Sequence, residues 1–215
     1  MTQLNDSVLV NPGTGTPVGT HLLNGKEVQG VTVVDDTGNI KGTIPAYRLF
    51  IPAGAAGANK VHFDLFNATA SGKTLRVLSV RAIKDGSVAV TGALSVKLYL
   101  TRTTAVGTTG TAATAEGTSL TAPTLSEMDP ANAALPAGVT ARQAPGGGAT
   151  AGAVICERHV FTEETSAVYG EVEFLNPNTD DIQPLIVPEN TGIRVVQGSV
   201  ASVGNIGFDV LFEAV

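Results

Sequence analysis

The chain has 215 residues, of which 43% are hydrophobic, 15% charged and 5% aromatic, with 25 glycines, 11 prolines and no tryptophan. So high a hydrophobic share excludes wholesale disorder, which goes with few aliphatic residues and high net charge. The glycine and proline content, with a charged share below the usual ~25%, argues against a helical bundle or coiled coil. A β-rich chain remains, and its length suits one domain because sandwiches and barrels often reach ~200–250 residues.

The net charge of -6 is unevenly distributed along the chain. Residues 1–102 carry 10 basic and 6 acidic side chains, whereas residues 103–215 carry 3 and 13. An acidic half argues against nucleic acid as a partner, since phosphate binding depends on Lys and Arg. The basic residues of the first half sit singly between apolar neighbours, a pattern typical of the solvated side of a strand.

Features of cellular targeting are also missing from the sequence. The N-terminus lacks a basic segment followed by an apolar one, and the apolar runs fall far short of the ~18 residues of a membrane helix. The single cysteine, Cys156, excludes an internal disulfide framework. We therefore expect a protein made and used in the cytoplasm, or in a particle assembled there, without a membrane partner.

Residues 1–30 predict an extended N-terminal arm. Two prolines and three glycines fall within residues 11–20, which disfavours regular structure. The short apolar segment Val8, Leu9 and Val10 precedes them and can pair with a strand of another chain. We expect residues 31–215 to form a single domain.

Short apolar segments between turn residues predict the strands of this domain. Residues 75–84 are apolar on both faces, as in an interior strand, and residues 94–102 alternate cleanly between apolar and polar. Residue 52, a proline, is expected to close the second strand. The predicted strands are residues 31–34, 47–51, 60–66, 75–84, 94–102, 153–161, 168–175, 182–187, 193–197 and 206–212.

A long insertion loop is expected at residues 103–150. Ala, Gly and Thr supply 17 of the 22 residues from 103 to 124, which leaves few bulky side chains for a core. We expect at most an edge strand near Leu120 and one short helical turn over Ser126–Leu135. The many short strands and the lack of helical periodicity predict an all-β, jelly-roll-like antiparallel β-sandwich, whose eight core strands accommodate such a loop.

Two motifs invite a cofactor and fail on their context. Ser71-Gly72-Lys73-Thr74 matches the end of a phosphate-binding loop, but the full pattern needs glycine where Asn67 stands, and a strand is expected where a helix should follow. Cys156 and His159 have a zinc-ligand spacing without a second pair. On a strand, residues three apart point to opposite faces. A structural zinc site needs four ligands, and the His-x-His of metal-binding cupins is missing, so we expect no cofactor and no metal.

Catalytic patterns are equally weak in this sequence. The acidic pairs Asp35-Asp36, Glu163-Glu164 and Asp180-Asp181 lie in turn contexts without the spacing of a calcium loop, and only an adventitious cation at Asp180 and Asp181 stays open. No Gly-x-Ser-x-Gly nucleophile motif occurs, and sugar-binding clefts usually contain more Trp and Tyr. We expect no catalytic residues, no small-molecule substrate and therefore not an enzyme.

Residues 44–215 resemble small β-sandwich virion proteins of tailed bacteriophages. The resemblance rests on YRLFIPAGAAGANKVHFDLFN, TLRVLSVRAIKDGSVAVTG, LSVKLYLTRT and PLIVPENTGIRVVQGS. It implies a capsid decoration (cement) protein, a jelly-roll trimer on the outside of the phage head that clamps neighbouring subunits of the major capsid protein. It also implies an N-terminal arm that reaches a neighbour, for which strand addition by Val8, Leu9 and Val10 is suited.

Other functions remain open on the sequence alone. A tail, collar or receptor-binding fibre-head protein of the same virion is the main alternative, although such heads usually expose aromatic residues behind a fibrous repeat. A carbohydrate-binding module or an enzyme without a recognisable motif comes next. The low aromatic content counts against the first of these.

Overall fold

The computed structural model describes residues 20–23, 26–29, 44–85, 94–129, 134–146, 151–162, 171–175 and 183–215. The chain forms two compact units, Met1–Thr43 and Ile44–Val215, so that residues 31–43, which the sequence assigned to the sandwich, group with the first unit. Within residues 1–30, where we expected an extended arm, β1 (Thr20–Leu23) and β2 (Lys26–Gln29) form an antiparallel hairpin. The predicted strand at residues 31–34 lies outside the described residues.

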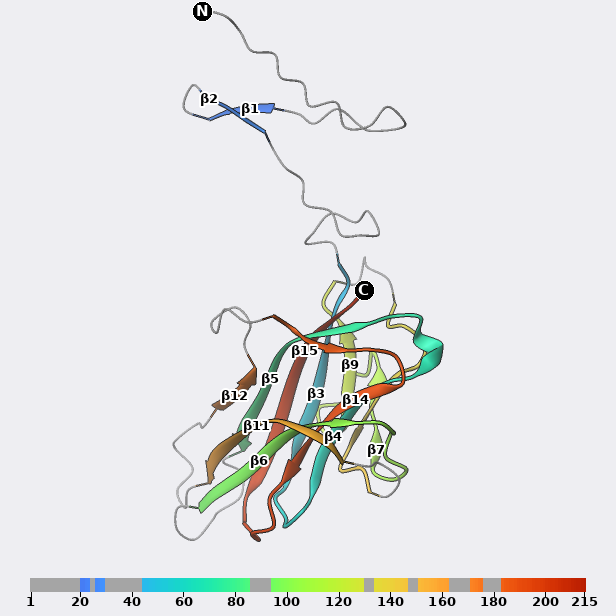
Figure 1. The fold of residues 1–215 in the computed structure, drawn as a ribbon. Helices are drawn as coiled ribbons and strands as arrows, with labels where there is room; N and C mark the ends of the chain where they lie inside the picture. The colour runs from blue at the N-terminus through green and yellow to red at the C-terminus, as the bar shows by residue number, and fades with distance from the viewer. Residues whose placement is uncertain are drawn as a thin grey trace, which may run out of the picture. The chain divides into compact units, whose positions relative to one another are not determined.

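The second unit is a sandwich of two sheets (Figure 1). One sheet has the strand order β11-β6-β14-β4-β10-β7, and the other has β12-β5-β15-β3-β9-β8, with β13 also paired to β5. All pairings are antiparallel except the one between β8 and β9. The strands are β3 (Ala46–Ala55), β4 (Val61–Asn67), β5 (Leu75–Asp85), β6 (Leu94–Thr103), β7 (Thr111–Ala112), β8 (Thr114–Ala115), β9 (Thr124–Glu127), β10 (Val139–Gln143), β11 (Ala151–Thr162), β12 (Glu171–Leu175), β13 (Leu185–Val187), β14 (Thr191–Gln197) and β15 (Asn205–Ala214).

Eight of these strands form a jelly roll, which confirms the predicted all-β sandwich. The first four, β3, β4, β5 and β6, pair in turn with β15, β14, β12 and β11. The chain is therefore a long hairpin whose two halves run side by side and are rolled up together. Rolling brings β15 against β5 and β14 against β6, which completes the two sheets without closing them into a barrel.

The core lies between the two sheets and follows the period-two alternation of the strands. The rings of Phe63 on β4 and Phe208 on β15 are 5.2 Å apart, and those of Tyr47 and Phe212 are 5.6 Å apart. On β6 the buried residues are Val96, Leu98 and Leu100, as the sequence predicted. The largest buried side chains are Tyr47, Phe63, Phe174, Phe208, Phe212, Leu49, Ile51, Leu65, Leu75, Leu98, Leu100 and Leu125.

The prediction that Pro52 closes a strand is wrong, because β3 continues to Ala55. The pairing of β15 with β3 shifts register between Ile206 and Phe208, so Pro52 lies in a bulge. On its other side β3 pairs with β9 only as far as Phe50. A proline has no N–H for a ladder, and a bulge beyond the end of a neighbouring strand is where it is tolerated.

The insertion at 103–150 contains strands instead of the expected helical turn. Thr124–Glu127, which overlaps the predicted turn at Ser126–Leu135, is β9, and it pairs with β3 and buries Leu125 between the sheets. Leu120, expected near an edge strand, is 85% exposed and lies outside the strands. Burial of one leucine and pairing with β3 override the weak local preference of this stretch.

The insertion also joins the two sheets at one side of the sandwich. β7 is at the edge of one sheet and β8 at the edge of the other, and only Ala113 separates them. The Ala113 N–H donates to the Ala141 carbonyl at 2.8 Å, and the Thr114 N–H to the Pro123 carbonyl at 3.0 Å. At the opposite side the Arg158 guanidinium of β11 donates to the Glu173 carbonyl of β12 at 3.0 Å. Both sides are therefore bridged, one by backbone and one by a side chain.

We expect Phe208→Ala to lower the free energy of unfolding by about 3–5 kcal/mol, because it removes a ring packed between the sheets. Leu120→Ala serves as the control and should change it by less than about 0.5 kcal/mol, since Leu120 is exposed. Urea unfolding followed by circular dichroism measures both. Equal effects of the two substitutions would contradict the assignment of the core.

Candidate interaction surface

The segment Ser71–Thr74 is a turn between two strands, as its context predicted. A 3-10 turn, η1 (Thr69–Ser71), ends at Gly72 in the left-handed region with φ 63°, and β5 follows. The Gly72 N–H donates to the Glu189 carboxylate at 2.7 Å. A carboxylate of the chain itself thus occupies the amide that a phosphate would need.

The residues once considered as metal ligands lie apart. The Cys156 thiol points toward the Phe174 carbonyl, 3.7 Å away, and burial raises its pKa, whereas His159 lies on the outer side of the same strand. His62 is buried on β4. Within the part of the chain that the structure describes, no three His, Cys, Asp or Glu side chains group as metal ligands. Val8, Leu9 and Val10, and the three acidic pairs, including Asp180 and Asp181, lie outside the described residues.

His62 is a structural histidine in the core. Its Nε2 lies 3.3 Å from the Gln197 amide oxygen, and its ring centre lies 5.2 Å from that of Phe208. Burial, assisted by the nearby charge of Lys60, lowers its pKa from 6.5 to about 4. His62 is therefore neutral in the folded protein at neutral pH.

Asp64 fastens the insertion to the outer face of its sheet. Its carboxylate accepts a hydrogen bond from the Gly107 N–H at 2.7 Å, and it pairs in register with Arg142 on β10 and Arg194 on β14. Burial raises the pKa of Asp64, while the Gly107 N–H and the two arginines oppose that rise. The sequence placed Asp64 opposite the apolar face of β4 but gave no signal that the insertion would cover it.

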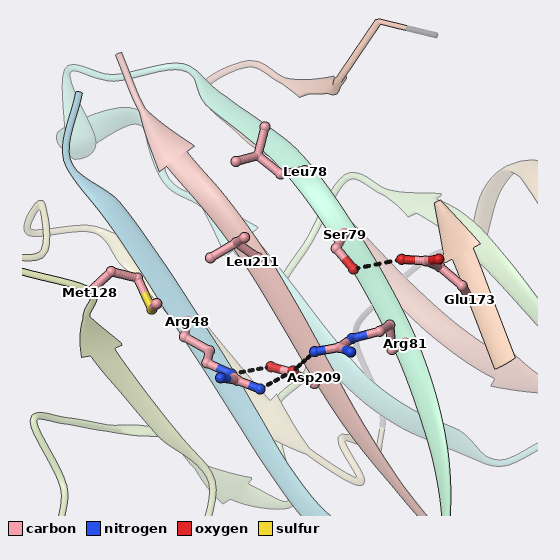
Figure 2. Close-up of a pocket in the computed structure, with 8 residues that line it drawn as sticks. All are labelled: Arg48, Leu78, Ser79, Arg81, Met128, Glu173, Asp209 and Leu211. Carbon is pink, nitrogen blue, oxygen red and sulfur yellow. Dashed lines mark hydrogen bonds and ion pairs between the residues drawn. The ribbon is translucent and has the colours of Figure 1, made fainter. Parts of the chain in front are cut away.

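The outer face of the other sheet is left exposed and carries a row of paired charges (Figure 2). Asp209, in the middle of β15, is bound on one side by Arg48 of β3, with Nε to Oδ1 at 2.7 Å, and on the other by Arg81 of β5 at 2.7 Å. Arg81 also donates to Glu171 of β12 at 2.8 Å. The row thus alternates in sign across four strands, Arg48, Asp209, Arg81 and Glu171.

These contacts stabilise the charged forms of the groups in the row. The hydrogen bond to Asp209 raises the pKa of Arg48. Burial works against the charge of Arg81, but its hydrogen bonds to Glu171 and Asp209 raise the pKa overall. Only 5% of the Asp209 side chain is exposed, so its carboxylate is held by the arginines rather than by water. The row is internally neutral and offers no spare positive charge to an anion.

We call this surface the ladder face and define it by the row of charges and the residues around it. A shallow pocket of about 220 Å³ opens here, lined by Arg48, Leu78, Ser79, Arg81, Met128, Glu173, Asp209 and Leu211. Phe50, Ile83 and Met128 are exposed apolar side chains on strands of this sheet or directly after one. Paired charges fringed by apolar side chains on a rigid sheet suit the docking of another protein.

The sequence predicted only part of this surface. Arg76 and Arg81 stand singly on one strand, which suggested solvated positions, and both instead pair with acids from distant strands, Arg76 with Glu213 at 3.0 Å. The signal that could have found the row was the excess of bases in the first half and of acids in the second. It becomes informative once the topology sets these halves side by side.

No family model, no curated protein and no solved structure matches the chain. Among the described residues there is also no helix long and apolar enough to cross a membrane. The fold and its surfaces therefore carry the functional argument.

We expect the stability of the protein to fall as the pH is lowered from about 6.5 to about 4. Over this range an unfolded His62 takes up a proton that the folded core excludes, because the folded pKa of about 4 lies below the ordinary 6.5. The loss attributable to His62 is about 3 kcal/mol when complete. Urea unfolding of the wild type and of His62→Gln, compared at pH 7.5 and pH 5, should show the smaller pH effect in the variant. Identical pH profiles would contradict this role.

Proposed function

We propose that the protein is a structural component of a tailed-bacteriophage virion, a capsid decoration protein. It binds the outside of the head and clamps neighbouring subunits of the major capsid protein. It carries out no catalytic step in this role and needs no cofactor. Its place is then the capsid surface, after assembly in the host cytoplasm.

The ladder face is the observation that carries the proposal. A sheet braced on its inner side by the core, with its outer charges neutralised by one another, presents a surface that needs no rearrangement to dock. The exposed Met128 and Phe50 can fill shallow hollows of a partner, while Arg48 and Glu171 set its orientation. The jelly-roll fold is the one that the resemblance implies.

The separate N-terminal unit supports the same proposal. Residues 1–43 form their own compact unit, whose described part is a two-stranded hairpin. A hairpin of two strands is at best marginally stable by itself and gains from a neighbouring protein. We propose that Val8, Leu9 and Val10 of this unit add as a strand to a neighbour, and that the protein self-associates as a trimer. Several weak contacts per trimer then sum to a lasting attachment.

Met128→Glu should weaken binding to matching empty phage heads by about tenfold, since it places a charge at the docking face, a cost of about 1.4 kcal/mol. Val203→Glu is the matched control, because Val203 is 53% exposed and Met128 51%, but Val203 lies in the loop before β15. Co-sedimentation with the heads measures the bound amount, and wild-type protein should bind near-stoichiometrically and raise the melting temperature of the shell. Equal binding by the two variants would overturn the ladder face as the docking surface.

A signal of only a few copies per particle would instead move the protein to the tail or collar. Absence of wild-type binding to the heads would overturn the decoration role.

Replacing Val8, Leu9 and Val10 together by Asp should reduce retention on the heads while the sandwich keeps its melting temperature. Mass photometry of the free protein tests the trimer separately. Unchanged retention would contradict strand addition by this segment, and a monomer at all concentrations would contradict self-association.

A further inference from the structure

A second polar cluster lies on the outer face of the other sheet, where β6 and β11 pair. The Ser95 hydroxyl is 2.8 Å from His159 Nδ1, and His159 Nε2 is 3.0 Å from the Glu157 carboxylate. The Lys97 ammonium lies 3.0 Å from the same carboxylate oxygen. A nucleophile, a base and an orienting acid are thus joined in one hydrogen-bonded chain.

The acid end of this chain fixes where the protons lie. Hydrogen bonds from Lys97 and then from His159 lower the pKa of Glu157, which keeps it an acceptor. His159 therefore carries its hydrogen on Nε2 and donates it to Glu157. That tautomer leaves Nδ1 as the acceptor for the Ser95 hydroxyl. The arrangement is that of a serine nucleophile with a general base held by a carboxylate, with the roles of the two ring nitrogens exchanged relative to the serine proteases.

The backbone holds the cluster in place. Lys97 pairs in register with His159, and Ser95 with the residue two positions after His159 on β11. The register shifts of β11 fall before Cys156, so the part that carries Glu157 and His159 is regular. Val96 and Val160, on the opposite side of the same two strands, are buried in the core. Groups fixed to paired strands are positioned more precisely than groups on loops.

We propose that Ser95 is an activated nucleophile that accepts acyl groups from small esters. Its Oγ bonds to the ester carbonyl carbon while its proton passes to His159 Nδ1. The bond from the carbonyl carbon to the alcohol oxygen then breaks, and that oxygen leaves with the electron pair and takes the proton from His159. Water releases the acyl group from Ser95 as a carboxylic acid by the same sequence of steps.

The open position of the cluster defines the substrate class. The side chains of His159 and Glu157 are 43% and 39% exposed, so the acyl donor arrives from solvent. General-base assistance contributes typically 10²–10⁴-fold, and in such a water-exposed site we expect about the lower value. Activated esters of small acids fit this site, and the activity does not depend on binding to a phage head.

The experiment treats the full chain with p-nitrophenyl acetate and follows p-nitrophenolate release and the site of acetylation by peptide mass spectrometry. We expect Ser95 to be acetylated about 10²-fold faster than Ser119, an exposed serine whose side-chain partner is the hydroxyl of Thr121. The acetyl group on Ser95 is an ester and should be removed by hydroxylamine. Acetyl groups on lysine are amides and should persist.

The variants separate reactivity from folding. Ser95→Ala and His159→Ala should abolish the fast phase, and added imidazole should restore it in His159→Ala alone. Glu157→Gln should slow the fast phase, and Glu157→Asp should retain part of it, as expected for a positioning residue. Ser119→Ala is the control and should behave as the wild type.

Acetylation of Ser95 at the rate of Ser119, or acetylation of Lys97 with Ser95 unmodified, would overturn the proposal. So would a fast phase that survives His159→Ala without imidazole. Thermal melts of the variants show whether each is folded when it is tested.

Discussion

The pairing of each core strand of the first half with a strand of the second half underlies the rest of the molecule. It places a basic segment of the chain beside an acidic one. Among the described residues, every ion pair of a lysine or arginine joins a base from residues 1–102 to an acid from residues 103–215. The uneven charge of the sequence is therefore a property of the rolled hairpin. It fixes register across the strands, because like charges directly opposite one another are unfavourable in a sheet.

The two sheets share one core but treat their outer faces differently. On the β4 sheet the insertion folds over Asp64 through the Gly107 N–H, so a carboxylate that the alternation directs outward becomes buried. On the β15 sheet Asp209 is shielded by two arginines alone, and the face around it remains accessible. The same problem, a carboxylate in the middle of a sheet, is solved once by backbone and once by side chains. The second solution leaves a surface that another protein can reach.

The sequence predicted the elements whose pattern is local. The alternation of residues 94–102 and the apolar character of residues 75–84 were sufficient, since both follow from burial between packed sheets. It was wrong where a distant partner decides, as at Pro52, which depends on a bulge in β15, and at Ser126–Leu135, where pairing with β3 produces a strand. The cluster of Ser95 and His159 was beyond sequence reasoning for the same reason. It exists only in one register of β6 against β11.

The seam at Ala113 gives the sandwich a mechanical asymmetry. There the backbone passes directly from one sheet to the other and is hydrogen-bonded on both sides of the crossing. At the far side the sheets are linked by the guanidinium of Arg158, which can swing away at the cost of two hydrogen bonds. A force that separates the sheets therefore opens them like the covers of a book, with Ala113 at the spine. The first core residues to be wetted are those next to β11 and β12.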